Sequence, residues 1–174
     1  HRWLHNIEGD VPDGDVRVPI GKAQKMKMGT DVTIISMSYM TIEALHAVEF
    51  LEKNHVSCEL IDLRTVKPID WEMIFESVRK TGRLLALDTA QATNLINGEI
   101  IARVSMECFS ALKQGPRRLA LPDFPTPTSS GLTKDFYKGA EDIVIVAGNM
   151  LGKNVNVSEL EQERKFPHDV PGDW

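Results

Sequence analysis

The sequence predicts an α/β domain in which helices cover both faces of a mostly parallel sheet, so that the domain has three layers. Short runs of aliphatic and β-branched residues alternate three to four times with amphipathic segments of helical length. Such helical segments return the chain to a parallel neighbouring strand, whereas antiparallel strands need only a short turn. With 174 residues, of which 42% are hydrophobic, the chain is long enough to enclose its own core.

Strands are expected where short apolar runs lie between turn residues. These runs occupy residues 22–28, 31–37, 57–63, 83–88 and 117–121. The Gly29-Thr30-Asp31 turn between the first two runs favours a hairpin, which would make the first strand antiparallel to the second. Helical segments separate the remaining strands, which we therefore expect to be parallel.

Helices are expected where apolar residues recur at intervals of three and four. The first covers about 41–53, and the second begins after Asp70, a candidate N-cap, and ends at Gly82. Asn97 is the candidate cap of a third helix, whose buried stripe comprises Ile101, Val104, Cys108, Ala111 and Leu112. The last helix covers 140–151, although the β-branched run at 143–146 leaves a strand open there.

The ends of the chain differ in composition from its middle. Residues 1–20 contain many acidic and turn-forming residues and are expected to form a linker or arm, while residues 21–152 form the domain. Residues 153–174 are expected to be a polar tail, with a short helix at about 158–164. Because the chain begins at His1 without an initiator Met, we expect it to be a fragment of a longer protein.

Composition excludes several classes of function. The net charge of −5 disfavours nucleic-acid binding, which needs a concentrated basic surface. No apolar run approaches the roughly 18 residues that span a bilayer, so no membrane association is expected. Cys58 and Cys108 lie in apolar stretches without a CxxC partner, which favours an intracellular compartment, either the cytoplasm or the mitochondrial matrix. Phosphate-binding, metalloprotease and hydrolase motifs are absent from the sequence, so we expect no catalytic, cofactor-binding or metal-binding residue.

Six polar residues are candidates for a pocket or a partner interface, because they lie at or beyond the carboxyl ends of predicted strands, which form the usual ligand edge of such sheets. They are Ser36, Ser38, Tyr39, Arg64, Asp88 and Glu99. Each also has a structural alternative. The hydroxyls can cap a loop, Arg64 can pair with Asp62 or Asp70, and Glu99 can complement the dipole of a helix N-terminus while Asp88 bonds the loop.

An ordered series of segments gives the sequence a resemblance to a known family. The segments are VPIGKA at 18–23, GTDVTI at 29–34, IDLRTVKPID at 61–70, KTGRLL at 80–85, GEI at 98–100, PDFPTPTSSGLTKDFY at 122–137 and GAEDIV at 139–144. Together they resemble the C-terminal domain of the transketolase superfamily, in particular that of the β subunits of thiamine-diphosphate-dependent 2-oxoacid (pyruvate or branched-chain) dehydrogenases. One departure is Asn94-Leu95, which stands where the family commonly has two glycines, so we expect this loop to differ in shape.

The resemblance implies a fold and a role. The fold would be a Rossmann-like sheet of five strands with one antiparallel strand, which the expected hairpin would supply. The parent enzyme would decarboxylate a 2-oxoacid and pass the acyl group to a lipoyl arm. Thiamine diphosphate and Mg²⁺ would bind to domains outside this chain, which alone would be inactive. Its partners would be a second copy in a homodimer, the chains or upstream domains that bind the cofactor, and the acyltransferase component.

Two alternatives to this interpretation remain open. The chain can be a free-standing small-ligand-binding or regulatory module with a flavodoxin-like fold. It can also be one half of a split enzyme, in which a separate chain supplies the cofactor-binding domains.

Overall fold

The computed structural model describes residues 4–5, 7–133 and 136–163, and within these residues the sheet has five strands in the order β1-β3-β2-β4-β5. The strands are β1 (Gln24–Lys27), β2 (Val32–Ser36), β3 (Cys58–Asp62), β4 (Leu84–Gln91) and β5 (Arg117–Leu121). Strands β2 to β5 pair in parallel, and β1 is antiparallel to its neighbour. The sequence therefore predicted the fold class correctly, including the single antiparallel strand.

The helices alternate with the strands along the chain. They are α1 (Tyr39–Lys53), α2 (Trp71–Thr81), α3 (Ile96–Glu107), α4 (Ser130–Thr133), α5 (Ala140–Asn149) and α6 (Ser158–Glu163), together with the short 3-10 helix η2 (Phe109–Ala111). The β-branched run of the last long segment forms helix rather than strand. None of these helices is both long and apolar enough to cross a membrane.

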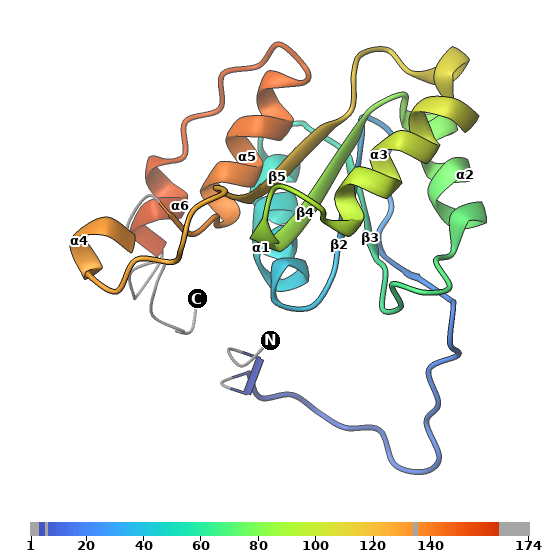
Figure 1. Ribbon diagram of the computed structural model, residues 1–174, viewed down its shortest axis with the longest axis horizontal. Helices are drawn as coiled ribbons and strands as arrows, with labels where there is room; N and C mark the ends of the chain where they lie inside the picture. The colour runs from blue at the N-terminus through green and yellow to red at the C-terminus, as the bar shows by residue number, and fades with distance from the viewer. Residues whose placement is uncertain (1–3, 6, 134–135, 164–174) are drawn as a thin grey trace.

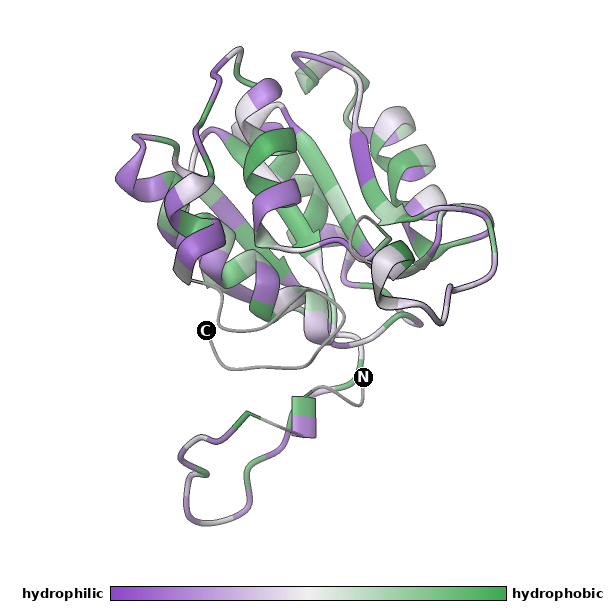
Figure 2. Cartoon of the chain, turned by 90° about the vertical axis from the view of Figure 1, so that its left-hand side faces the viewer, coloured by the Kyte–Doolittle hydropathy of each residue, from purple (hydrophilic) through white to green (hydrophobic). Residues whose placement is uncertain are grey.

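Helices cover both faces of the sheet (Figure 1). Buried side chains between the helices and the sheet form two separate apolar clusters. Helices α1 and α5 enclose one cluster, to which α6 adds Leu160, and helices α2 and α3 enclose the other. Successive residues of β2 contribute to different clusters, Ile34 to the first and Ile35 to the second, because side chains alternate between the faces of a strand. In Figure 2 the hydrophobic strands accordingly lie inside a shell of more polar helices.

The expected hairpin between the first two strands does not form. β1 pairs with β3, not with β2, with Gln24 opposite Asp62 and Lys25 opposite Ile61. The connection from β1 to β2 therefore passes over the start of β3, where a Cβ on Gly29 would lie only 2.2 Å from the carbonyl carbon of Cys58. Glycine is thus needed here for close approach to another strand rather than for a tight turn.

Both caps of α2 agree with the sequence, whereas the cap of α3 does not. The Asp70 side chain accepts a hydrogen bond from the backbone N–H of Met73, and Gly82 ends α2 in the left-handed region at φ 74°. Helix α3 begins instead after Leu95, and Asn97 is fully buried, where its side chain donates to the carbonyl of Ala86 in β4. Packing against the sheet therefore overrides the capping preference of Asn97.

The buried stripe of α3 is also shifted from the expected one. Val104 and Cys108 are buried as expected, but Ile100 is fully buried and Ile101 only partly. Ala111 belongs to the separate 3-10 helix. Because Ile100 and Ile101 are adjacent and equally apolar, the helical period alone does not decide which of them faces the sheet.

Residues 7–20, at the N-terminal side of the domain, lie outside the layered body. Residues 7–18 form no helix or strand and are exposed to solvent, and the segment loops away from the sheet in Figure 1. It is attached at its end, where the backbone N–H of Gly21 donates to the Thr65 hydroxyl and that of Ala23 to the Asp70 carboxylate. Asp70 thus anchors the entering chain as well as capping α2.

Candidate functional site

A small cavity lies at the carboxyl edge of the sheet, between β2 and β4. The connections from these two neighbouring strands run in opposite directions, from β2 to β3 and from β4 to β5, which is the switch point where open α/β sheets place their ligands. The cavity has a volume of about 30 Å³ and is lined by Tyr39, Met40, Asp88, Thr89, Leu121, Tyr137 and Lys138. It is large enough for a water molecule or a single small polar group.

Asp88 is the buried acid of this cavity. Only 8% of its surface is exposed, and burial raises the pKa of its carboxyl because the charged form is poorly solvated. Backbone N–H groups of Thr89 and Ala90 oppose this shift by donating to the carboxylate, the latter at 3.3 Å. The protonation of Asp88 is therefore sensitive to any charge that enters the cavity.

Tyr39 is held in place by a carboxylate that also fixes a helix N-terminus. Its hydroxyl donates to Glu43 one turn along α1, and the second oxygen of Glu43 accepts the backbone N–H of Ala140, the first residue of α5, at 2.9 Å. Glu43 is almost fully buried. Glu43 therefore connects Tyr39, a residue of the cavity wall, to the N-terminus of α5.

Ser36, the last residue of β2, and Ser38, just before α1, serve the local structure. Ser36 is fully buried, and its hydroxyl shares a 3.0 Å hydrogen bond with that of Thr41 in α1. Ser38 immediately precedes α1 with a positive φ of 54°, and its carbonyl accepts the N–H of Thr41. They place α1 against the end of β2, while neither of them lines the cavity.

The structure does not bring Arg64 and Glu99 to the cavity. Arg64 lies at the β1 side of the sheet, where its side chain donates to Gln24 and its backbone N–H to Asp62. Glu99 is exposed in the first turn of α3, a position that complements the helix dipole. Of the six residues singled out in the sequence, only Tyr39 and Asp88 line the same cavity.

The remaining lining residues were missed because they come from distant parts of the chain. Thr89 and Leu121 lie near the carboxyl ends of β4 and β5, the edge where open α/β sheets place ligands. Thr89 would have been found by including the residue after Asp88, and Leu121 by including the end of the next strand. Tyr137 and Lys138 precede α5. Only the docking of α5 against α1 brings them to β4, and no local sequence pattern reports that contact.

The loop after β4 contains a residue in the left-handed backbone region, although it has no glycine at Asn94-Leu95. Asn94 has φ 63°, which asparagine tolerates better than most residues, and Leu95 is extended at φ −84°. The loop is also bonded to the loop after β5, because Thr93 donates from its backbone and its hydroxyl to Asp123 at 2.8 and 2.7 Å. The departure from a glycine pair is therefore accommodated by Asn94.

The potential metal ligands and nucleophiles of the described residues form no reactive centre. Within residues 4–5, 7–133 and 136–163, three or more His, Cys, Asp or Glu side chains do not gather in a group that could hold a metal ion. Both cysteines are buried. Burial, with a smaller effect from Asp31, raises the pKa of Cys58 to about 12, and burial also raises the pKa of Cys108. These thiols stay protonated near neutral pH and are poor nucleophiles.

Comparison with known proteins identifies relatives of this fold. The family model described as the C-terminal domain of transketolase matches residues 21–159. Among solved structures, a chain described as "Split gene transketolase, inactive beta4 tetramer" is similar with a TM-score of 0.69 and 27% identity, covering 83% of this chain and 46% of that one.

Curated relatives are β subunits of larger enzymes. The acetoin:2,6-dichlorophenolindophenol oxidoreductase subunit β of Cupriavidus necator is 36% identical, covering 84% of this chain and 44% of the relative. The 2-oxoisovalerate dehydrogenase subunit β of Bacillus subtilis is 40% identical, covering 79% and 42%. The pyruvate dehydrogenase E1 component subunit β of Mycoplasma pneumoniae is 38% identical, covering 83% and 43%. The chain thus spans less than half the length of the relatives it matches, and within that span it belongs to the transketolase C-terminal domain family.

Proposed function

We propose that this chain is the assembly domain of a β subunit similar to those of 2-oxoacid dehydrogenases. The observation that carries the proposal is the family match over residues 21–159, in a chain that spans only 42% to 44% of its β-subunit relatives. The parent enzyme would decarboxylate a 2-oxoacid and transfer the acyl group to a lipoyl arm. In this proposal residues 1–20 are the entering arm, residues 21–152 the domain, and residues 153–174 the tail.

The proposed parent uses thiamine diphosphate and Mg²⁺, but the cavity at the carboxyl edge of this chain does not fit that cofactor. Ligands of this size occupy pockets of roughly 300–1,000 Å³, whereas the cavity at the carboxyl edge has about 30 Å³. One of its walls is the buried Asp88, whose negative form would repel a diphosphate. We therefore assign cofactor binding to other domains, derive no catalytic step from these residues, and expect this chain alone to be inactive.

The partners in this proposal are a second copy of the chain and the domains that bind the cofactor. The structural relative is described as a β4 tetramer, which supports self-association of a homologous chain. It is also described as the product of a split gene, which supports the variant in which a separate chain supplies the cofactor domains. The acyltransferase component would contact the assembled enzyme. All of these components would meet inside the cell, in the cytoplasm or the mitochondrial matrix.

A small-ligand or regulatory role is the second candidate function. The observation that favours it is the cavity at the switch point of the sheet, with Asp88 and Lys138 in its lining. A ligand there would have to be very small or would have to displace the segment that carries Tyr137 and Lys138. The assembly role needs no such movement, and for that reason we place it first.

Calorimetric titration with thiamine diphosphate and Mg²⁺ tests the assignment of the cofactor. We expect no saturable heat of binding to the 174-residue chain, because its described cavity at the switch point is too small for the cofactor. A β subunit or a transketolase that contains the cofactor domains serves as the positive control. A micromolar dissociation constant for the isolated chain would contradict the proposal.

A further inference from the structure

Aromatic and charged side chains share the outer side of α2 and α3. Trp71 and Phe75, one turn apart in α2, stack with their ring centroids 5.7 Å apart. The guanidinium carbon of Arg103 in α3 lies 4.3 Å from the centroid of the Trp71 ring. Figure 1 shows the two helices side by side, on the face of the sheet that α1 and α5 do not cover.

An open groove of about 610 Å³ runs along this side of α2. Its lining residues all come from that one helix, namely Trp71, Glu72, Phe75, Glu76 and Arg79. Small ligands bind where protein surrounds most of their surface, whereas these residues would contact a ligand from one side only. The groove is therefore better suited to the surface of another protein than to a small molecule.

The exposed apolar surface continues from α2 onto the end of α3 and onto η2. Met106 is 70% exposed and Phe109 78% exposed, and Met106 follows Arg103 by one turn of α3. Arg79 connects this region to the groove, because its guanidinium donates to the backbone carbonyl of Glu107 at 3.4 Å. Tryptophan, phenylalanine, methionine and arginine are enriched in protein interfaces. We define the α2–α3 face as Trp71, Glu72, Phe75, Glu76, Arg79, Arg103, Met106 and Phe109.

The charges of α2 are arranged so that this face complements itself. Glu72 lies in the first turn of α2 and Arg79 in the last, and their spacing of about two turns puts them on one stripe of the helix. Both are exposed, and neither forms an ion pair within the part of the chain that the structure describes. A second α2 lying antiparallel across a two-fold axis would place Glu72 of each copy opposite Arg79 of the other.

We propose that the α2–α3 face binds a second copy of this chain, with the two α2 helices antiparallel about a two-fold axis beside Phe75. This proposal rests on the assembly role proposed above and names the surface that carries it. Glu72 of each copy pairs with Arg79 of the other, and the contact covers the aromatic row together with Met106 and Phe109. Because the same face is used on both copies, this contact joins two chains and does not extend further.

Reversing the two charges, singly and together, tests the proposal in the 174-residue chain. Glu72→Arg places arginines opposite each other at both ends of the contact, and Arg79→Glu places glutamates there. Each variant should therefore raise the dissociation constant of the dimer about tenfold or more, as measured by light scattering over a dilution series. An equimolar mixture of the two variants restores opposite charges at both ends, as does the double variant, so both should associate like the parent chain.

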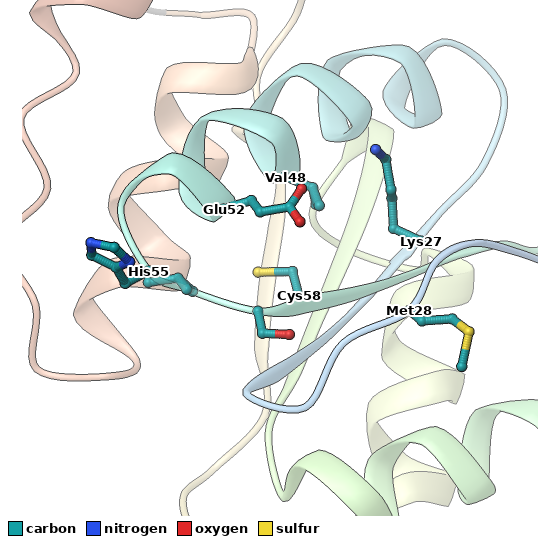
Figure 3. A pocket seen from close by; sticks show the side chains of 8 residues that line it. Lys27, Met28, Val48, Glu52, His55 and Cys58 are labelled. Carbon is teal, nitrogen blue, oxygen red and sulfur yellow. The ribbon is translucent and has the colours of Figure 1, made fainter.

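Glu52→Arg is the matched control, because it reverses an exposed glutamate on the other face of the sheet. Figure 3 shows Glu52 extending from α1 beside the cavity at the amino edge of the sheet. Its side chain is exposed near the C-terminal end of the helix, where a cation is favourable. This variant should fold and self-associate like the parent chain. Circular dichroism verifies the fold of every variant.

The outcomes separate this surface from the assembly role as a whole. A parent chain that stays monomeric would contradict both proposals. A parent that self-associates, with single variants of equal affinity, would overturn the α2–α3 face and leave the assembly role standing. Weakened single variants that do not recover in the mixture or in the double variant would overturn the antiparallel pairing of Glu72 with Arg79.

Discussion

Asp88, near the carboxyl end of β4, and Asp123, in the loop after β5, show how two carboxylates acquire opposite properties. Asp88 is buried in the cavity at the switch point, and burial raises its pKa. Asp123 is exposed, and hydrogen bonds from the hydroxyl and the backbone N–H of Thr93 lower its pKa. The two residues therefore contribute to stability with opposite dependence on pH.

Replacing Asp88 by Asn is expected to stabilise the chain at neutral pH. The pKa of Asp88 is higher in the folded chain than in the unfolded chain, where it is about 3.9. Below the unfolded pKa the carboxyl is protonated in both states and burial of its charge costs no stability. That cost appears as the pH rises and is complete above the folded pKa. The gain from Asp88→Asn should thus grow with pH and vanish in acid, as measured by denaturant unfolding across a pH series.

The matched variant Asp123→Asn should behave in the opposite way. The lowered pKa of Asp123 supplies stability that is present above about pH 3.9 and is lost as the pH falls through the folded value. Its substitution should therefore destabilise the chain at neutral pH. If both variants show the same sign and slope, the assigned burial of Asp88 is wrong.

At Gly29 the backbone of β3 leaves no room for a side chain. A Cβ there would lie 2.2 Å from the carbonyl carbon of Cys58 and 2.5 Å from the nitrogen of Glu59, and a strand cannot yield as a flexible side chain can. We expect Gly29→Ala to lower the free energy of unfolding by about 2–3 kcal/mol. Gly98→Ala, in α3 with no neighbour within 4 Å, should instead raise it by up to about 1 kcal/mol. Equal effects in urea titrations would contradict the close approach.

At the scale of elements, a buried carboxylate joins two strands and a helix. Glu59 of β3 is fully buried and forms ion pairs with Lys80 of α2 and, at 3.4 Å, with Lys25 of β1. Burial alone raises the pKa of Glu59, but hydrogen bonds from Lys80, Ser77 and the N–H of Gly29, together with the charge of Lys25, lower it overall. The edge strand β1 is thus held by charge as well as by its ladder.

Glu59→Gln is expected to cost about 2 kcal/mol at neutral pH. Breaking a buried pair commonly costs about 3–5 kcal/mol, but both lysines are partly exposed and can turn toward water. The stability from Glu59 is present above its unfolded pKa of about 4.3 and is lost as the pH falls through the lower folded value. Glu76→Gln on the exposed side of α2 is the control and should change stability by less than about 0.5 kcal/mol. An equal loss in both variants, measured by thermal unfolding, would refute this role.

The elements also show why the sequence predicts some features and not others. Helix α2 was predicted to within a residue at each end because Asp70 and Gly82 act locally, through a cap and a left-handed residue. The sequence does not predict the partner of β1, because the segment at Gly29 allows β1 to pair with either β2 or β3. The backbone pairing with β3 in the folded sheet decides between them. Asn97 was misassigned for the same reason, since its bond to Ala86 depends on docking of α3 against the sheet.

The candidate site was predictable only in part. Asp88 is found because it lies at the end of the clear apolar run of β4, where open α/β sheets place ligands, and Tyr39 because it opens the helix after β2. Tyr137 and Lys138 enter the cavity through the packing of α5 on α1, a contact between segments about 100 residues apart that Glu43 and Ala140 secure. A contact of that range leaves no local pattern in the sequence.

At the scale of the whole molecule, the layered body encloses its own core, whereas residues 7–20 of the N-terminal arm are exposed to solvent. Both faces of the sheet are covered by helices, so the domain has its own core. The arm, by contrast, exposes Val11, Val16, Val18 and Ile20 to solvent by 55% or more of their surface. In the proposed assembly role, another chain or domain would cover these side chains.

The mass of the chain in solution tests the assembly role most directly. We expect size-exclusion chromatography with light scattering to give at least twice the monomer mass of 19.5 kDa, and dilution to shift the mass toward the monomer by mass action. A species that stays at 19.5 kDa at the highest accessible concentration would contradict self-association through this domain and would favour the small-ligand role.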